Sequence, residues 1–236
     1  LAAKGFIPKP AGTPPAPVPN VPVRPPIMCA GCMHRPTFYA MKKVWRDAVY
    51  PSDIGCYTLG LQLGVVDTTI CMGSAPSLGS GINHAGDPRE VVATIGDSTF
   101  LHSGIPGILN AVYNGAEMTL VILDNRITAM TGHQGNPING ITLQERPSHE
   151  VDLVALVKAL GVNRVRVVDP HDLDACLKVL AEETASDELS VVVFKAPGAL
   201  LVKSNAGPYA VDEDACTKCG VGIKLGCPAI GKDERT

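Results

Sequence analysis

Charged and aromatic residues are both scarce in this chain of 236 residues, at 18% and 4%. The formal net charge is only −3, and lysine and arginine form no stripe, which argues against a nucleic-acid surface. No run of eighteen apolar residues occurs, so the sequence predicts no membrane span. The charged, apolar and small-residue order of a signal peptide is missing as well. We therefore expect neither nucleic acid nor a membrane among its partners.

Aliphatic side chains dominate what is present, since 45% of the residues are hydrophobic although few are aromatic. Apolar runs rich in Val, Ile and Leu alternate with helical segments, an order typical of a doubly wound parallel sheet and hence of an α/β fold. Strands are expected at 91–95, 118–123, 165–168 and 190–194, with a further strand-like run at 53–58. Helices are expected at 37–48, 74–83, 103–115, 151–160 and 171–184, and a long loop at 126–146.

The two ends of the chain differ in composition from the rest. Residues 1–26 are rich in proline and alanine, which predicts an extended linker, and the start at Leu1 suggests a piece of a longer protein. A cysteine-bearing tail is expected at 206–236, which leaves 27–205 as the folded domain. Eight cysteines without a secretion signal favour the reduced cytoplasm and metal or cluster chemistry over disulfides.

Two polar residues follow neighbouring strands of the predicted sheet. Asp97, within the run Gly96-Asp97-Ser98, follows one strand, and Asn125 follows the next. Ligands bind at the carboxyl ends of the strands in open α/β sheets. Two hard oxygen donors there, beside the start of a helix, suit a Mg²⁺ ion that bridges a bound diphosphate. Alternatively, Asp97 and Asn125 are ordinary turn residues at the ends of their strands and bind no metal.

This segment resembles the thiamine-diphosphate fingerprint, usually written GDG and, further on, NN. More closely, GDSTFLHSGIPGILNAVYNG and LDNRITAMTGHQ resemble the α subunits of indolepyruvate:ferredoxin oxidoreductases, within the 2-oxoacid:ferredoxin oxidoreductase superfamily. The likeness extends from about Pro25 to Pro228. It implies the thiamine-diphosphate-binding portion of such a subunit. It also implies that Mg²⁺ is bound by the side chains of Asp97 and Asn125 and by the carbonyl of Ile127.

The resemblance implies further contacts to thiamine diphosphate. Gly96, Ser98 and Thr99 would lie against the cofactor, with Ser98 in place of the usual glycine, as in this family, and Asp124 in place of the usual first asparagine. Met72, in the run CMGSAP, is a candidate for the apolar wedge that bends thiamine, and core packing explains it equally well.

Three histidines are candidates for the same site. His102 lies at the start of the helix that should point at the diphosphate, and we expect it to contact substrate or thiamine. A backbone hydrogen bond at the helix start is its alternative role. His133, in the loop MTGHQGNP, is expected at the site entrance, and His34, beside Cys32, either bonds a carboxylate or cluster sulfur or faces solvent in a turn.

Cysteines at CxxC spacing open the folded domain. Cys29 and Cys32, followed by Cys56, match the spacing with which related oxidoreductases hold a 4Fe–4S cluster near thiamine. The fourth cysteine of that set would follow the last strand, but Gly198 stands there, and a glycine cannot bind iron. Cys71 could take the place of the missing fourth ligand, although nothing in its spacing requires this. The alternative is a set of reduced structural or reactive thiols.

The tail sequence ACTKCGVGIKLGCPAI resembles half of a ferredoxin motif. Cys216, Cys219 and Cys227 are in register with that motif, whereas Gly222 stands where its third cysteine would be. In two-cluster ferredoxins the last of these cysteines binds the other cluster. We therefore expect this tail to assemble no 4Fe–4S cluster by itself.

The resemblance implies oxidative decarboxylation of an aryl 2-oxo acid to an acyl-CoA, with electrons passed to ferredoxin. The implied partners are the 2-oxo acid, coenzyme A, ferredoxin and a β subunit or an upstream pyrimidine domain that supplies an activating glutamate, within an oligomer. Two other functions remain open. One is a non-oxidative thiamine-dependent decarboxylase or synthase, and the other is a catalytically silent paralogue that acts in assembly.

Overall fold

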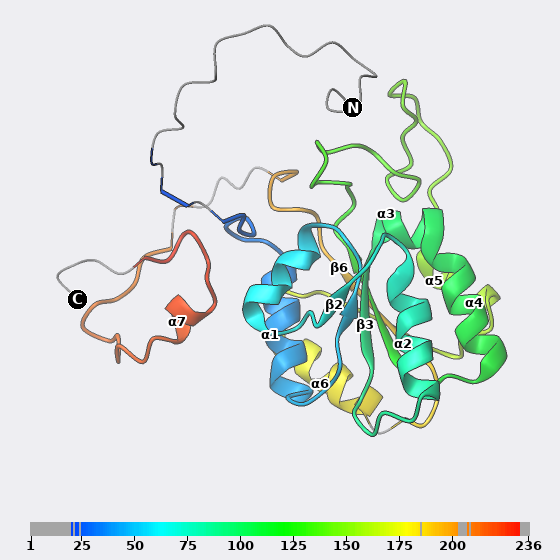
Figure 1. The fold of residues 1–236 in the computed structure, drawn as a ribbon. Coiled ribbons are helices and arrows are strands. Elements are labelled where there is room, and N and C mark those ends of the chain that lie inside the picture. The colour runs from blue at the N-terminus through cyan, green and yellow to red at the C-terminus, as the bar shows by residue number, and fades with distance from the viewer. Residues whose placement is uncertain are drawn as a thin grey trace, which may run out of the picture.

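The computed structural model describes residues 20, 22–23, 25–184, 186–202, 207 and 209–231. Its main body is one parallel sheet between two layers of helices, and the C-terminal segment lies beside this body (Figure 1). The predicted linker at 1–26 falls almost entirely outside the described residues, so its extended form stays a prediction. None of the described helices is long and apolar enough to cross a membrane.

Six parallel strands form the sheet in the order β2-β1-β3-β4-β6-β5. The central strands β3, β4 and β6 are fully buried along almost their whole length, as their Val, Ile and Leu content predicts. The strands are β1 (Pro51–Ser52), β2 (Thr68–Thr69), β3 (Val92–Gly96), β4 (Thr119–Asp124), β5 (Arg164–Val168) and β6 (Ser190–Lys195). The predicted α/β fold is confirmed.

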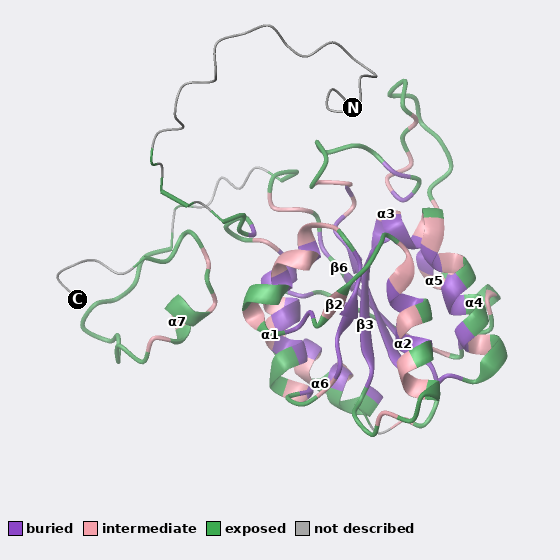
Figure 2. Cartoon of the chain, in the orientation of Figure 1, coloured by how far each residue is buried: buried purple, intermediate pink, exposed green. Residues whose placement is uncertain are grey.

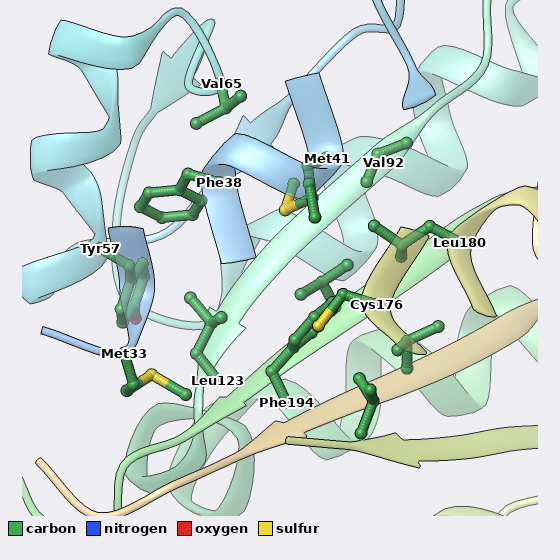
Figure 3. Close-up of a cluster of buried hydrophobic side chains, with 14 of the residues drawn as sticks. Met33, Phe38, Met41, Tyr57, Val65, Val92, Leu123, Cys176, Leu180 and Phe194 are labelled. Atoms are coloured by element: carbon green, nitrogen blue, oxygen red, sulfur yellow. The ribbon is translucent and has the colours of Figure 1, made fainter. Parts of the chain in front are cut away.

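Successive residues of each central strand contribute to two different hydrophobic cores, because side chains alternate across a sheet. In β3, Val92 packs into the core beneath α1 (His34–Val44) and α6 (Leu173–Thr184), whereas Ile95 packs into the core on the other face. Figure 2 shows both buried layers, and Figure 3 shows Phe38, Met41, Phe194 and their neighbours in the first core. The second core is covered by α2 (Ser74–His84), α4 (Ile105–Asn114) and α5 (Leu153–Ala159).

The strand-like run predicted at 53–58 is wrong. The strand ends at Ser52, and a 3₁₀ helix, η2 (Cys56–Leu63), follows it. The apolar pattern misleads here because Asp53 turns into the protein, where its carboxylate accepts hydrogen bonds from the start of α2 instead of continuing the strand. The short edge strand β2, which the sequence analysis did not identify, pairs with β1.

The helix predicted to begin at Ser103 begins earlier, directly at the end of β3. A short turn of α3 (Asp97–Thr99) continues through a π-helical turn, η3 (Phe100–Gly104), into α4. Pro106 lacks the N–H that would continue the α-helical bonding pattern across this point, and the wider turn lies just before it. Asp97 therefore occupies the first turn of a helical segment rather than a free loop.

The long loop expected after β4 is present. No helix or strand interrupts the described residues between Asn125 and Asp152, where only the isolated bridges Thr128–Gln134 and Ile141–Pro147 form. In the C-terminal segment the structure shows one short helix, α7 (Val221–Lys224). The domain limits set by composition are not tested further and stay predictions.

Candidate functional site

An open cavity lies at the carboxyl ends of β3 and β4. The register of the sheet places Gly96 beside Leu123, so the residues after the two strands meet at the same edge. The cavity is lined by eight of the residues that the sequence analysis assigned to cofactor or metal: Met72, Gly96, Asp97, Ser98, Thr99, His102, Asn125 and Ile127.

Asp97 is the most unusual residue of this cavity, because its carboxylate is buried and half of it has no partner. The side chain is only 2% exposed, Oδ1 accepts a hydrogen bond of 2.6 Å from the Ser98 N–H, and Oδ2 has no partner among the described residues. Burial, followed by the charge of Asp124, raises the pKa of Asp97 to about 7. An unpartnered buried oxygen of this kind is costly unless a ligand completes it.

Asn136 is a residue that the sequence analysis missed. It comes from the long loop after β4, and its amide favours the charged form of Asp97, with which it interacts. The Ile138 N–H fixes the amide oxygen of Asn136 at 3.0 Å, while its buried Nδ2 has no partner among the described residues. Nothing in the sequence pattern marks this asparagine apart from the glycine and proline that flank it.

The backbone turns sharply after β4 and presents Asn125 to the cavity. Arg126 has a φ of 65°, in the left-handed region, and its N–H donates to Asp124 Oδ1 at 3.2 Å. The Asn125 amide oxygen accepts from the Ile127 N–H at 3.2 Å. This turn holds the Asn125 amide and the following backbone at the strand-end cavity.

The donor set suits a magnesium ion that shares its shell with a bound anion. Asp97 offers a free carboxylate oxygen, and Asn125 and the backbone at Ile127 line the same cavity. Among the described residues, no three His, Cys, Asp or Glu side chains gather closely enough to hold a metal ion by themselves. Mg²⁺ is characteristically held by one or two protein oxygens together with phosphate oxygens and water, so these residues fit it.

Asp53 fixes the loop that carries Met72. Its buried carboxylate accepts hydrogen bonds from the N–H groups of Gly73 (2.9 Å) and Ala75 (2.7 Å) and from the Ser74 hydroxyl (3.1 Å). Asp53, directly after β1, is thereby tied to three consecutive residues at the start of α2, and Met72, just before those three, remains 55% exposed at the cavity. The core-packing role considered for Met72 does not apply, because the side chain lies outside both cores.

His102 lines the cavity from the π-helical turn. Its Nδ1 lies 2.8 Å from the Ser103 hydroxyl, which is also 3.4 Å from the Met72 carbonyl. The ring is thus bonded to a neighbouring side chain rather than to the backbone of the helix start. This contact connects the His102 imidazole to the Met72 loop and orients it along the cavity wall.

Tyr57 explains why the first residue of the fingerprint is glycine. A Cβ on Gly96 would lie 2.6 Å from Tyr57 Cε1, closer than real contacts allow. The Tyr57 hydroxyl lies 3.4 Å from Thr99 Oγ1, and the ring lines the cavity. The sequence analysis did not find Tyr57, because the run that contains it was read as a strand.

A second cavity of about 490 Å³ adjoins the first and brings three predicted cysteines together. Cys29, Cys32 and Cys56 line it, and so does Gly198. His133, expected at the entrance of the first cavity, lines this second one instead. Its remaining walls are mostly apolar and include Met28, Leu59 and Leu200.

The thiols of this second cavity do not complete a 4Fe–4S shell. Four thiolates are the usual ligands, and only three cysteines line the cavity, since Gly198 occupies the fourth position and Cys71 lines neither cavity. Burial raises the pKa of Cys32 to about 11 and also raises that of Cys56, so both are thiols at neutral pH. The space itself would admit a side chain at position 198, where a Cβ would lie 3.4 Å from Ile127.

His34 stands in the wall between the two cavities. It lines both, is 2% exposed, and its Nδ1 lies 3.4 Å from Cys32 Sγ. Its ring stacks on Phe38 and meets Tyr57 edge-on, each with a centroid distance of 6.2 Å. Burial lowers the pKa of His34 to about 4, so the ring is neutral, and its Nε2 has no partner in the described part of the chain.

The tail cysteines lie apart from both cavities. Cys216 and Cys219 are exposed, and Cys227 is half-buried. The tail is held to the domain at Arg35, whose guanidinium donates to the carbonyls of Leu225 and Met28, each at 2.6 Å.

The parallel sheet, the helical segment that starts at Asp97 and the oxygen donors at the strand ends are features of an α/β domain that binds a ligand at the carboxyl ends of its strands. The chain belongs to the family of thiamine pyrophosphate enzymes, C-terminal TPP-binding domain, which matches residues 53–194. Thiamine pyrophosphate is another name for thiamine diphosphate, so the cofactor class expected from the fingerprint is confirmed.

Among known proteins, the chain is similar to indolepyruvate oxidoreductase subunit IorA from several archaea. It is 42% identical to that of Archaeoglobus fulgidus over 89% of this chain, and 40% identical to that of Thermococcus kodakarensis over 92%. These matches cover 36% and 37% of the relatives, so the chain spans about a third of their length. The resemblance seen in the sequence is thereby confirmed.

Solved structures share the fold. A 2-oxoglutarate:ferredoxin oxidoreductase from Magnetococcus marinus superposes with a TM-score of 0.62 at 19% identity, covering 72% of this chain and 64% of the other. A 4-hydroxybenzoylformate decarboxylase from Rhodococcus jostii reaches 0.51 at 16% identity, covering 80% and 37%. At these identities the likeness shows the fold alone.

Proposed function

We propose that this chain is the diphosphate- and Mg²⁺-binding part of an indolepyruvate, or aryl 2-oxo acid, ferredoxin oxidoreductase. The observation that carries the proposal is the buried, unpartnered Oδ2 of Asp97 beside Asn125, at the carboxyl ends of adjacent parallel strands. Membership of the thiamine-binding domain family and the similarity to IorA subunits support the same assignment.

The residues have distinct roles in this proposal. The side chains of Asp97 and Asn125 and the carbonyl of Ile127 hold Mg²⁺, and the backbone of Ser98 and Thr99 faces the diphosphate from the start of the helical segment. Because Gly96 has no side chain, the Tyr57 ring can pack directly against its backbone. Bound thiamine diphosphate supplies an electron sink for decarboxylation.

The remaining cavity residues bear on the organic part of the cofactor and the substrate. Met72 presents an apolar, exposed side chain on a loop that Asp53 and Ser103 hold in place. His102 lies beside that loop and faces the same space, where it would contact substrate or thiamine. His133 reaches only the second cavity, so its role is separate from the diphosphate site.

A 4Fe–4S cluster is not assigned to the second cavity, because its three cysteines are one ligand short. Electron transfer to ferredoxin therefore relies on parts of the protein beyond these residues. The proposed substrates and partners are the aryl 2-oxo acid, coenzyme A, ferredoxin, and a β subunit or pyrimidine domain within a cytoplasmic oligomer. The word subunit in the names of the IorA relatives supports such an assembly.

A non-oxidative decarboxylase or synthase is the second candidate, and a silent assembly paralogue is the third. Gly198 is the observation that favours both, since an enzyme without a nearby cluster needs no fourth thiol there. Iron quantitation of the assembled protein, together with its anaerobic visible spectrum, separates the oxidative function from the second candidate. Binding of thiamine diphosphate separates it from the third.

The direct test is calorimetric titration of thiamine diphosphate with and without Mg²⁺. We expect Mg²⁺-dependent binding that weakens roughly a hundredfold or more in Asp97→Asn, since a lost charge-assisted contact set is worth on the order of 3 kcal/mol. The asparagine retains an acceptor for the Ser98 N–H, so the fold should persist. Asp152→Asn is the matched control, because it keeps the cap of α5 and lines no part of this cavity. Equal affinity in wild type and Asp97→Asn would remove Asp97 from the metal site.

A further inference from the structure

His34 is the one buried imidazole that the proposed function leaves unused. It begins α1, yet its side chain reaches the wall shared by both cavities. A buried ring nitrogen without a partner costs free energy, because water that it bonds in the unfolded chain is lost. The position of this ring beside the cofactor cavity suggests which molecule supplies the missing partner.

The Cys32 thiol lies against one of the two ring nitrogens of His34. Its sulfur lies 3.4 Å from His34 Nδ1 and already accepts a hydrogen bond from the His34 backbone N–H. A thiol that donates its S–H to Nδ1 leaves the proton of the neutral ring on Nε2. Phe38 and Tyr57 pack against the ring and hold its plane, so Nε2 keeps one direction.

We propose that His34 is a substrate-binding residue, whose Nε2–H donates a hydrogen bond to a carboxylate or carbonyl oxygen of the 2-oxo acid in the first cavity. The proposal rests on the proposed function of that cavity. Cys32 then acts as a positioning residue, since its thiol fixes the tautomer that makes Nε2 a donor. This role gives the CxxC cysteine a function that needs no cluster.

The class of ligand follows from the polarity of the group. A donor with no charge of its own pairs best with an oxygen that is negative or strongly polarised, and a 2-oxo acid carries both kinds on adjacent carbons. The diphosphate is already served by Mg²⁺ and the helix start in the proposed function. Apolar groups of the first cavity, among them Met130 and Leu123, suit the aryl side chain of the same substrate.

Two substitutions separate substrate binding from structure. In Asn the amide nitrogen overlays Nδ1, and in Gln it overlays Nε2. Within the complete oxidoreductase, we expect His34→Asn to raise the KM for phenylpyruvate about 10- to 100-fold, as loss of a hydrogen bond to a charged group predicts. His34→Gln should recover most of that loss, and both variants should keep the wild-type KM for coenzyme A and affinity for thiamine diphosphate. Equal KM values for the two variants would overturn the proposal.

A spectroscopic experiment needs no turnover. Calorimetry first establishes that the chain binds Mg²⁺ and thiamine diphosphate; absence of that binding contradicts the proposed function, whereas the spectra below test the role of His34. In the ¹⁵N-histidine-labelled chain, the His34 signals should show a protonated Nε2, and Cys32→Ala should abolish the preference for that tautomer. Addition of phenylpyruvate to the protein loaded with Mg²⁺ and thiamine diphosphate should shift the Nε2–H proton downfield, whereas the cofactor alone should not. A shift with the cofactor alone assigns His34 to thiamine, and no shift with either leaves it a structural residue; both results contradict the proposal.

Discussion

At the scale of single residues, the site is marked by groups that the fold leaves incomplete. Asp97 Oδ2 and Asn136 Nδ2 are buried side-chain atoms without hydrogen-bond partners in the described part of the chain, and the Asn136 amide favours the charged form of Asp97. A folded protein usually satisfies such groups, so their clustering at the strand ends reflects selection for a ligand rather than for stability. Asp124 adds a second carboxylate to the same edge of the sheet.

The raised pKa of Asp97 makes metal binding and stability depend on pH in opposite directions. Because the folded pKa, about 7, lies above the ordinary value of 3.8, the protonated form favours the fold. This contribution is complete below pH 4 and is lost as the pH rises through 7, at roughly 1.4 kcal/mol per pH unit at most. Mg²⁺ needs the carboxylate, so its affinity should rise from pH 5 to pH 8.

Thermal unfolding of the metal-free chain checks this prediction. The melting temperature of the wild type should fall more steeply between pH 5 and pH 7 than that of Asp97→Asn, whose amide does not titrate. In saturating Mg²⁺ and thiamine diphosphate the difference should shrink. Parallel pH profiles for the two proteins would show that Asp97 does not titrate in this range.

At the scale of elements, Asp53 connects the end of β1 to the start of α2. Asp53→Ala removes the acceptor for the N–H groups of Gly73 and Ala75 and leaves both without their partner in a buried setting. We expect a loss of about 2–4 kcal/mol in the free energy of unfolding, measured by urea denaturation. Asp152→Ala is the matched control, since Asp152 caps α5 in the same way but at an exposed position, where the cost is about 1 kcal/mol. Similar losses in both variants would mean that burial of Asp53 adds nothing.

The sequence predicted those elements whose pattern is repeated over several residues. The runs that form β3, β4 and β6 are mostly apolar, and the predicted bounds agree with the structure to within a residue or two. The pattern fails at 53–58, because the hydrogen bonds that turn Asp53 inward come from α2, about twenty residues away. The early helix start at Asp97 escaped detection for a similar reason, since a π turn has no pattern of its own.

The residues of the candidate site also fall into two groups, those that the sequence predicted and those that only the structure shows. Asp97, Asn125 and Ile127 were found because they follow apolar strands at positions that a known fingerprint specifies. Asn136, in a long loop, and Tyr57, in a 3₁₀ helix, come near Asp97 only in the folded chain, and Tyr57 also lines the cavity. Sequence spacing carries no information on such contacts, and neither does it reveal that His34 separates two cavities.

At the scale of the whole molecule, the chain matches only about a third of the length of its IorA relatives. Thiamine catalysis also requires a group that activates the cofactor, and no glutamate lines the first cavity. We expect the isolated chain to bind thiamine diphosphate but not to turn over indolepyruvate or phenylpyruvate with an electron acceptor. Decarboxylation by the purified chain, followed as CO₂ release, would show that the activating group lies within these residues.

The tail provides the last prediction, because its contacts show how it is held without iron. Arg35 donates to the carbonyls of Leu225 and Met28, so a guanidinium joins the tail to the CxxC loop. Cys216 and Cys219 are exposed, and Gly222 leaves their motif one thiolate short. We therefore expect no tail-bound iron and the same iron content in wild type and Cys216→Ala, Cys219→Ala.

Two further variants separate packing from metal binding in the tail. Arg35→Ala should make the tail more sensitive to limited proteolysis, since its anchoring hydrogen bonds are lost. Arg89→Ala is the control, because Arg89 is exposed and makes its ion pair with Asp87 rather than with the tail. Gly222→Cys should improve iron retention only when the partner motif of a second cluster is present, because the last cysteine of such motifs serves the other cluster. A stable 4Fe–4S spectrum that disappears in Cys216→Ala, Cys219→Ala would show instead that three cysteines suffice and that iron orders the tail.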